Sequence, residues 1–80
     1  MGEYMSKLVL DLSYGVTTVY NLQSTWLQPL TMSPGYMLCY EDDIYERGVI
    51  YRSKDKKYLK GVQDKIMTAH STGKSYVKLY

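Results

Sequence analysis

Apolar residues recur at helical spacing in residues 53–70, with polar residues between them. The apolar stripe consists of Leu59, Val62, Ile66 and Ala69, with Tyr58 at its edge. Charged residues fall mostly on the opposite side, and these are Lys56, Lys57, Lys60, Asp64 and Lys65. This pattern predicts a basic amphipathic helix that packs its stripe on a β-sheet formed by the rest of the chain.

The ends of this helix have recognisable signals. Ser53 is the expected N-cap, because its hydroxyl can accept a hydrogen bond from a first-turn N–H. Asp55 follows in the first turn, where the helix dipole favours negative charge. Gly73 is the expected stop, because glycine commonly ends a helix.

A β-hairpin is the alternative for the same stretch. Gly61 in mid-helix costs roughly 1 kcal/mol relative to alanine, which weakens the helix. Residues 49–52 and 57–62 can instead be two strands joined by residues 53–56. The apolar stripe continues to Ala69, beyond the end of the hairpin pattern, and we therefore favour the helix.

Alternation of apolar and polar residues predicts strands elsewhere. Residues 7–12 place Leu8, Leu10 and Leu12 on one side, which is typical of a half-buried strand. Residues 13–15 have turn composition, and residues 16–20 are rich in β-branched residues. The two segments predict a first hairpin.

A second hairpin and a final strand are predicted further along. Residues 36–40 and the segment that ends at 49–52 form the hairpin, with an acidic loop at 41–43 between them. Residues 75–80 form the last strand, with Val77 and Leu79 facing one way.

Residues 21–34 are the least regular part of the sequence. Pro29 and Pro34 argue against a long element across this stretch. Ser24 can cap one short turn that carries Trp26. Trp26 is expected to cover one end of the core, and an exposed anchor for a partner is the alternative.

These elements predict an α+β fold in the order β-β-β-β-α-β, with one helix on a mainly antiparallel sheet of about five strands. The 80 residues correspond to one domain, 1–80. Residues 1–6 are expected to be a loose leader, and Met5 is an alternative start.

The aromatic composition is unusual, with ten tyrosines, one tryptophan and no phenylalanine. Tyrosine is common in strands, and it is also enriched at protein interfaces. The single cysteine, Cys39, is expected to be a small buried hydrophobe. One cysteine cannot form a disulfide within the chain, which favours a reduced, intracellular compartment such as the cytoplasm.

Charge is distributed unevenly along the sequence. Residues 1–46 carry one basic and six acidic side chains, a net charge of −5, and residues 47–80 carry nine basic and two acidic side chains, a net charge of +7. Such asymmetry can mark a charged binding face. Alternatively, the acidic loop lies beside the basic helix and neutralises it.

No pattern of residues indicates catalysis. Residues 68–75, TAHSTGKS, resemble the tail of a phosphate-binding P-loop, but a helix is predicted before them and only five residues follow. His70 is interpreted as a helix-end histidine. The acidic residues Glu41, Asp42, Asp43 and Glu46 lack the ligand spacing of a calcium loop. We expect no enzyme activity, no metal, no cofactor and no membrane span.

A non-enzymatic protein-binding module is the leading hypothesis, with a homodimer as an open possibility. The size and composition are similar in general character to small phage or viral proteins that bind and inhibit a host protein. The expected contact residues are Tyr40, Glu41, Asp42, Asp43, Tyr45, Arg52, Lys56, Lys57 and Lys60.

Nucleic-acid binding is the alternative hypothesis, because basic residues are interleaved with tyrosines in residues 47–65. The residues expected to contact phosphates are Arg47, Arg52, Lys54, Lys56, Lys57, Lys60 and Lys65.

Overall fold

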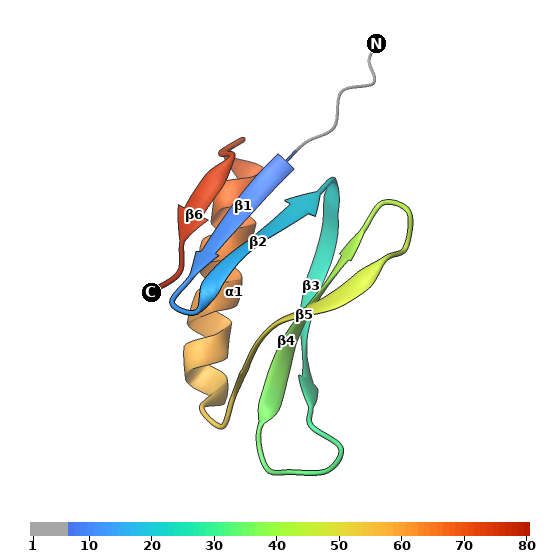
Figure 1. The fold of residues 1–80 in the computed structure, drawn as a ribbon, viewed down its shortest axis with the longest axis vertical. Helices are drawn as coiled ribbons and strands as arrows, with labels where there is room; N and C mark the ends of the chain where they lie inside the picture. Colours follow the sequence, from blue (N-terminus) through green and yellow to red (C-terminus); the bar gives the residue numbers. More distant parts are fainter. Residues whose placement is uncertain (1–6) are drawn as a thin grey trace.

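The computed structural model describes residues 7–80, so the predicted leader lies outside the described residues. Six strands and one helix are present in this part of the chain (Figure 1). In chain order they are β1 (Lys7–Leu12), β2 (Gly15–Tyr20), β3 (Leu22–Pro29), β4 (Tyr36–Asp42), β5 (Arg47–Ser53), α1 (Lys56–Ser71) and β6 (Tyr76–Lys78).

The strands form two three-stranded sheets, in the orders β2-β1-β6 and β3-β4-β5. β1 pairs with β2 as an antiparallel hairpin and with β6 in parallel. β4 is antiparallel to both β3 and β5. The α+β class, both predicted hairpins and the final strand are confirmed, but the strands divide between two sheets.

The interpretation of residues 21–34 as irregular was wrong. Residues 22–29 form β3, so that five strands precede the helix where four were expected. Trp26 pairs with Cys39 and Leu27 with Leu38, which places Trp26 within a strand and not in a capped turn. Pro29 is tolerated because it is the last residue of an edge strand. Asn21, with φ of 54°, makes the sharp bend between β2 and β3.

The helix is confirmed, and the alternative hairpin over residues 49–62 was wrong. Leu59, Val62, Ile66 and Ala69 are all buried, as predicted. The predicted start was two residues early, because Asp55 and not Ser53 is the N-cap. The Asp55 carboxylate accepts a hydrogen bond from the Tyr58 N–H at 3.1 Å, and the Ser53 hydroxyl accepts one from the Asp55 N–H at 3.0 Å.

The end of the helix agrees with the sequence. Gly73 has φ of 75°, and its N–H donates to the His70 carbonyl at 3.1 Å. His70 lies in the last turn, as expected for a helix-end histidine. A left-handed glycine next to the C-cap satisfies carbonyl groups that the helix itself leaves unpaired.

The helix stripe and the inner faces of both sheets make one core. The leucines of β1 are buried, which confirms their predicted direction. Leu38 and Ile50 come from the second sheet. A β-bulge places Ile50 between the pairs Leu38–Tyr51 and Cys39–Val49, so that Ile50 and Tyr51 both pack toward the core. Val49 and Arg52, on either side of the bulge, are consequently exposed.

Candidate functional site

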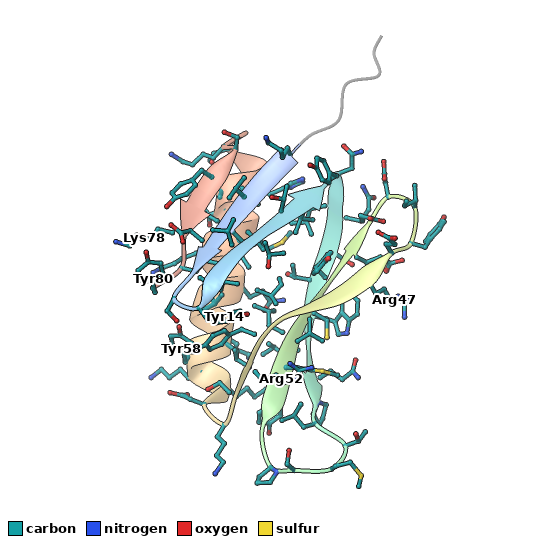
Figure 2. The ribbon with its side chains drawn as sticks, viewed as in Figure 1. Tyr14, Arg47, Arg52, Tyr58, Lys78 and Tyr80 are labelled. Carbon is teal, nitrogen blue, oxygen red and sulfur yellow. The ribbon has the colours of Figure 1, made fainter. Side chains whose placement is uncertain are left out.

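The side of the β3-β4-β5 sheet that faces away from the helix carries a regular grid of side chains. We call this side the outer face. Strand register gives three cross-strand rows, which are Ser24–Glu41–Arg47, Trp26–Cys39–Val49 and Gln28–Met37–Arg52. Arg47 and Arg52 lie at opposite ends of β5, so charge flanks an apolar central row (Figure 2).

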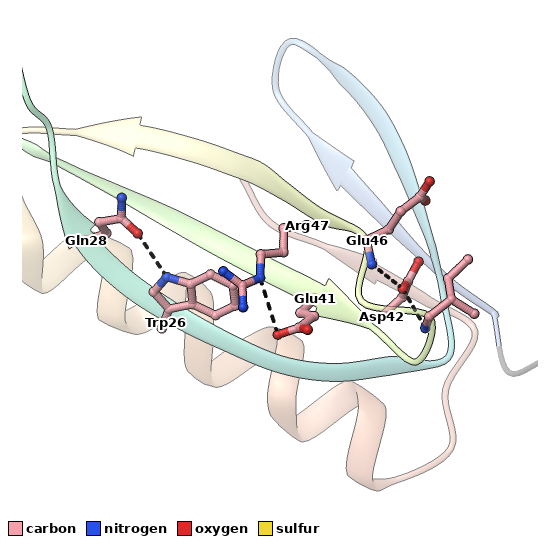
Figure 3. Close-up of polar contacts among 7 residues, drawn as sticks. Trp26, Gln28, Glu41, Asp42, Glu46 and Arg47 are labelled. Carbon is pink, nitrogen blue, oxygen red and sulfur yellow. Dashed lines mark hydrogen bonds and ion pairs between the residues drawn. The ribbon is translucent and has the colours of Figure 1, made fainter.

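The central row forms an open depression of about 300 Å³. It is lined by Trp26, Gln28, Cys39, Arg47, Gly48 and Val49. The Trp26 indole N–H donates to the Gln28 side-chain oxygen at 3.2 Å, which fixes the plane of the indole (Figure 3). The Arg47 guanidinium carbon lies 5.7 Å from the centroid of the Trp26 ring. Arg47 also pairs with Glu41, with 3.6 Å between Nε and Oε1. The Trp26 side chain is therefore held in a defined orientation at the surface.

Cys39 lies in this row and is buried beneath its neighbours, as predicted for a small hydrophobe. Burial raises the pKa of its thiol, and the positive charge of Arg52 lowers it to a smaller extent. A raised pKa keeps the thiol protonated and therefore a poor nucleophile. We conclude that Cys39 contributes packing and not reactivity.

The β2-β1-β6 sheet also has a side that faces away from the helix, but its composition differs. Its rows are Lys7–Tyr20, Val9–Thr18–Tyr76 and Asp11–Val16–Lys78. The Asp11 carboxylate accepts a hydrogen bond from the Tyr76 hydroxyl. Charged and hydroxyl groups interrupt every row, which is the usual composition of a solvated sheet face. The outer face of β3-β4-β5 is the more interface-like of the two, because it combines tryptophan, methionine and arginine.

The turn between β4 and β5, which we call the hairpin tip, consists of residues 43–46. The Asp42 carboxylate accepts hydrogen bonds from the N–H groups of Ile44 and Glu46, each at 2.9 Å (Figure 3). Tyr45 has φ of 66°, and its N–H donates to the Asp42 carbonyl at 3.2 Å. Ile44 is 70% exposed and Tyr45 is 81% exposed. The turn thus presents two large side chains on a backbone that is already ordered.

A third surface surrounds the connection between β5 and α1. We call it the basic corner, and its exposed residues are Arg52, Lys54, Lys56 and Lys57. The Lys56 ammonium lies 5.2 Å from the centroid of the Tyr36 ring. The start of α1 and the hairpin tip lie at opposite ends of the molecule (Figure 1). The acidic tip therefore lies apart from the basic corner.

Three tyrosines, one each from the β1–β2 turn, β5 and the first turn of α1, meet beside the basic corner, and we call them the tyrosine ladder. Tyr14 stacks on Tyr51 with centroids 5.6 Å apart and 16° between the ring planes. Tyr51 is tilted at 59° to Tyr58, at 5.8 Å. The Tyr14 hydroxyl donates to the Ile50 carbonyl.

No protein-family model, no curated protein and no solved structure matches this chain.

The structure places the expected protein contacts on several surfaces. Glu41 and Arg52 lie on the outer face, and Asp43 and Tyr45 lie at the hairpin tip. Tyr40 packs against the core with its ring over Gly48, and the Asp42 carboxylate is occupied by the turn. Lys56 and Lys57 belong to the basic corner, and Lys60 is exposed one turn further along α1.

The expected phosphate contacts are also separated in space. Arg47 lies on the outer face, where it contacts Trp26 and Glu41. Lys65 lies further along the helix, in a groove of about 300 Å³ that it shares with Lys74 and Val77 of the C-terminal segment. Residues 47–65 are thus not one continuous basic surface.

The remaining sequence motifs have structural roles. The P-loop-like segment begins in the last turns of α1, and a short strand follows it, so that the negative end of the helix dipole faces the loop. That arrangement disfavours bound phosphate and is the reverse of a P-loop. In the described part of the chain, no helix is both long enough and apolar enough to cross a membrane.

Proposed function

We propose that this chain is a non-enzymatic protein-binding module whose contact surface is the outer face together with the hairpin tip. The observation that carries the proposal is the apolar row Trp26–Cys39–Val49 on a sheet whose opposite side packs on the helix. Val49 is exposed, Trp26 is partly exposed, and Cys39 is buried between them. Interface hot spots are enriched in tryptophan, tyrosine and arginine. The outer face and the hairpin tip together present one residue of each type, which are Trp26, Tyr45 and Arg47.

Charge defines the partner that would fit. Within residues 7–80, Arg52 has no ion-pair partner, so a carboxylate of the partner is the expected counterpart at that end of the face. Asp43 and Glu46 are exposed at the other end, where a basic group of the partner is expected. The partner would therefore present an apolar patch with an acidic group on one side and a basic group on the other. We propose that the chain blocks that surface of its partner, as small phage and viral inhibitors of host proteins do.

Binding by the face is favoured over addition of a strand at an edge of this sheet. β3 and β5 are its two edge strands. Gln63 of the helix donates to the Thr25 carbonyl of β3 at 3.0 Å, and Tyr14 donates to the Ile50 carbonyl of β5. Side chains that cover main-chain acceptors in this way protect an edge from pairing with another chain.

Affinity capture with matched variants tests the proposal. Val49→Glu places a charge in the apolar row, and Val16→Glu makes the same change on the outward side of the other sheet. We expect the native chain and Val16→Glu to retain the same protein from a cell lysate, with or without nuclease, and Val49→Glu to lose it. With the captured protein purified, Trp26→Ala is expected to weaken its binding by about 2 kcal/mol or more. Equal capture by both valine variants, or a signal that nuclease removes, would refute the proposal.

A further inference from the structure

We propose that the tyrosine ladder and the basic corner form a second binding site, one that takes single-stranded nucleic acid. The site is distinct from the apolar row of the outer face and does not depend on the proposed protein-binding function. Bases would stack on the exposed ring of Tyr14, and phosphates would lie along Lys54 and Lys57.

The ring of Tyr14 has the geometry of a stacking platform. One of its faces lies against Tyr51 in a nearly parallel arrangement, and the side chain is nevertheless 64% exposed. The opposite face of the ring is therefore directed to solvent. The hydrogen bond from the Tyr14 hydroxyl to the Ile50 carbonyl anchors the ring to β5. A rigid aromatic ring with one free face is what an unpaired base stacks on.

Positive charge lies beside this platform. Arg52 is close enough to Tyr14 for its charge to lower the pKa of the phenol, opposing the increase that burial and Tyr51 cause. The next five residues of the chain include three exposed lysines, which are Lys54, Lys56 and Lys57. The one acidic residue among them, Asp55, is the helix N-cap, and its carboxylate accepts the Tyr58 N–H. Phosphates would therefore encounter a net positive surface.

An exposed tyrosine and an exposed lysine elsewhere on the surface provide a control. Lys7 and Tyr20 pair across β1 and β2 and are both exposed, and these ends of the two strands lie at the opposite end of the molecule from the start of α1 (Figure 1). Within residues 7–80, no second aromatic ring stacks on Tyr20. Lys7→Glu and Tyr20→Ala thus reproduce the charge and ring changes of Lys57→Glu and Tyr14→Ala at a surface that is not proposed to bind.

The test is fluorescence anisotropy with a labelled oligothymidylate of about 12 nucleotides, within the range of known single-strand site sizes. We expect the logarithm of the affinity to fall with that of the salt concentration at a slope of about −2 to −3, which corresponds to three or four phosphates. Tyr14→Ala is expected to weaken binding about tenfold, in the range of one base stacked on an aromatic ring. Tyr14→Phe keeps the ring and is expected to bind like the native chain.

Two comparisons decide the outcome. Lys57→Glu is expected to reduce affinity more than Lys7→Glu. Tyr14→Ala is expected to leave the affinity for inorganic polyphosphate unchanged, because polyphosphate has charge without bases. The proposal is overturned if the oligonucleotide does not bind at low salt. It is also overturned if the two lysine variants are equivalent, or if Tyr14→Ala and Tyr20→Ala have the same effect. Circular dichroism melting of each variant confirms that it is folded.

Discussion

Replacing Asp42 by alanine is expected to destabilise the β4–β5 hairpin, on which the hairpin tip depends. The Asp42 side chain is only 9% exposed, and its Oδ1 atom accepts two N–H groups at 2.9 Å. Hydrogen bonds to a charged group contribute about 1.5–3 kcal/mol each. The N–H groups that lose their acceptor belong to the exposed residues Ile44 and Glu46, so water compensates part of the loss. We therefore expect the free energy of unfolding to fall by about 2 kcal/mol in total.

Urea unfolding measured by two probes tests this value. Trp26 fluorescence reports on the β3-β4-β5 sheet, and circular dichroism reports on the helix. For a chain of this size, 2 kcal/mol corresponds to a decrease in Tm of about 8–16 °C. Asp42→Asn keeps the Oδ1 acceptor without the charge and is expected to lose about half as much.

Asp43→Ala is the matched control, since it removes the same charge from the next residue. Within residues 7–80, the Asp43 side chain makes no hydrogen bond or ion pair, and the change is expected to alter stability by less than about 0.5 kcal/mol. The reasoning is refuted if Asp42→Ala is as stable as the native protein, or if the two alanine variants are equally destabilised.

The remaining predictions concern the helix, the sheet and the thiol. Gly61→Ala is expected to stabilise the protein by up to about 1 kcal/mol in thermal unfolding, because nothing lies within 4 Å of the added Cβ. The same change at Gly48 would bring Cβ to 2.6 Å from the Tyr40 ring and is expected to destabilise the protein by about 1–3 kcal/mol. A more stable Gly48→Ala variant would contradict the packing of Tyr40 over Gly48. Ile66→Ala, at a fully buried helix position, is expected to lower stability in urea by about 2–5 kcal/mol. Because burial raises the pKa of Cys39, alkylation by iodoacetamide at pH 8 is expected to be slow in the native protein and fast in urea. Alkylation at equal rates in the native protein and in urea would contradict this burial. The raised pKa also means that the contribution of the protonated thiol to stability is present below the ordinary thiol pKa and is lost as the pH rises through the raised value.

The elements that the sequence predicted well have strong local periodicity. The leucines of residues 8–12 alternate without interruption, and the helix stripe from Leu59 to Ala69 is regular, so burial of one side follows directly. The start of the helix was displaced because Ser53 and Asp55 are both good N-caps. The structure uses both residues, with the Ser53 hydroxyl accepting from the Asp55 N–H.

β3 could not be predicted because its sequence, LQSTWLQP, lacks apolar–polar alternation and ends in a proline. This strand is specified by pairing with β4 across the sheet, and such non-local pairing can override local preference. The outer face depends on β3 for Trp26 and on the bulge at Ile50 for the positions of Val49 and Arg52. Neither feature has a local signal.

The sequence singled out some residues of the candidate site. Arg52, Asp43 and Tyr45 are exposed where a partner can reach them. Met37 and Val49 were not singled out, because apolar residues in a strand do not reveal which side of the sheet they occupy until its partners are known. Tyr14 was missed for a similar reason, since it stacks on Tyr51 of another element, and Tyr51 in turn contacts Tyr58 of the helix.

Site-specific photocrosslinking tests the central claim most directly, which is that a protein partner covers the outer face. A benzophenone amino acid is introduced at position 49, in the apolar row, or at position 16, in the outward side of the other sheet. Irradiation in cells is expected to give one dominant protein adduct from position 49 and none from position 16. The same adducts from both positions, or no protein adduct from position 49, would contradict the claim.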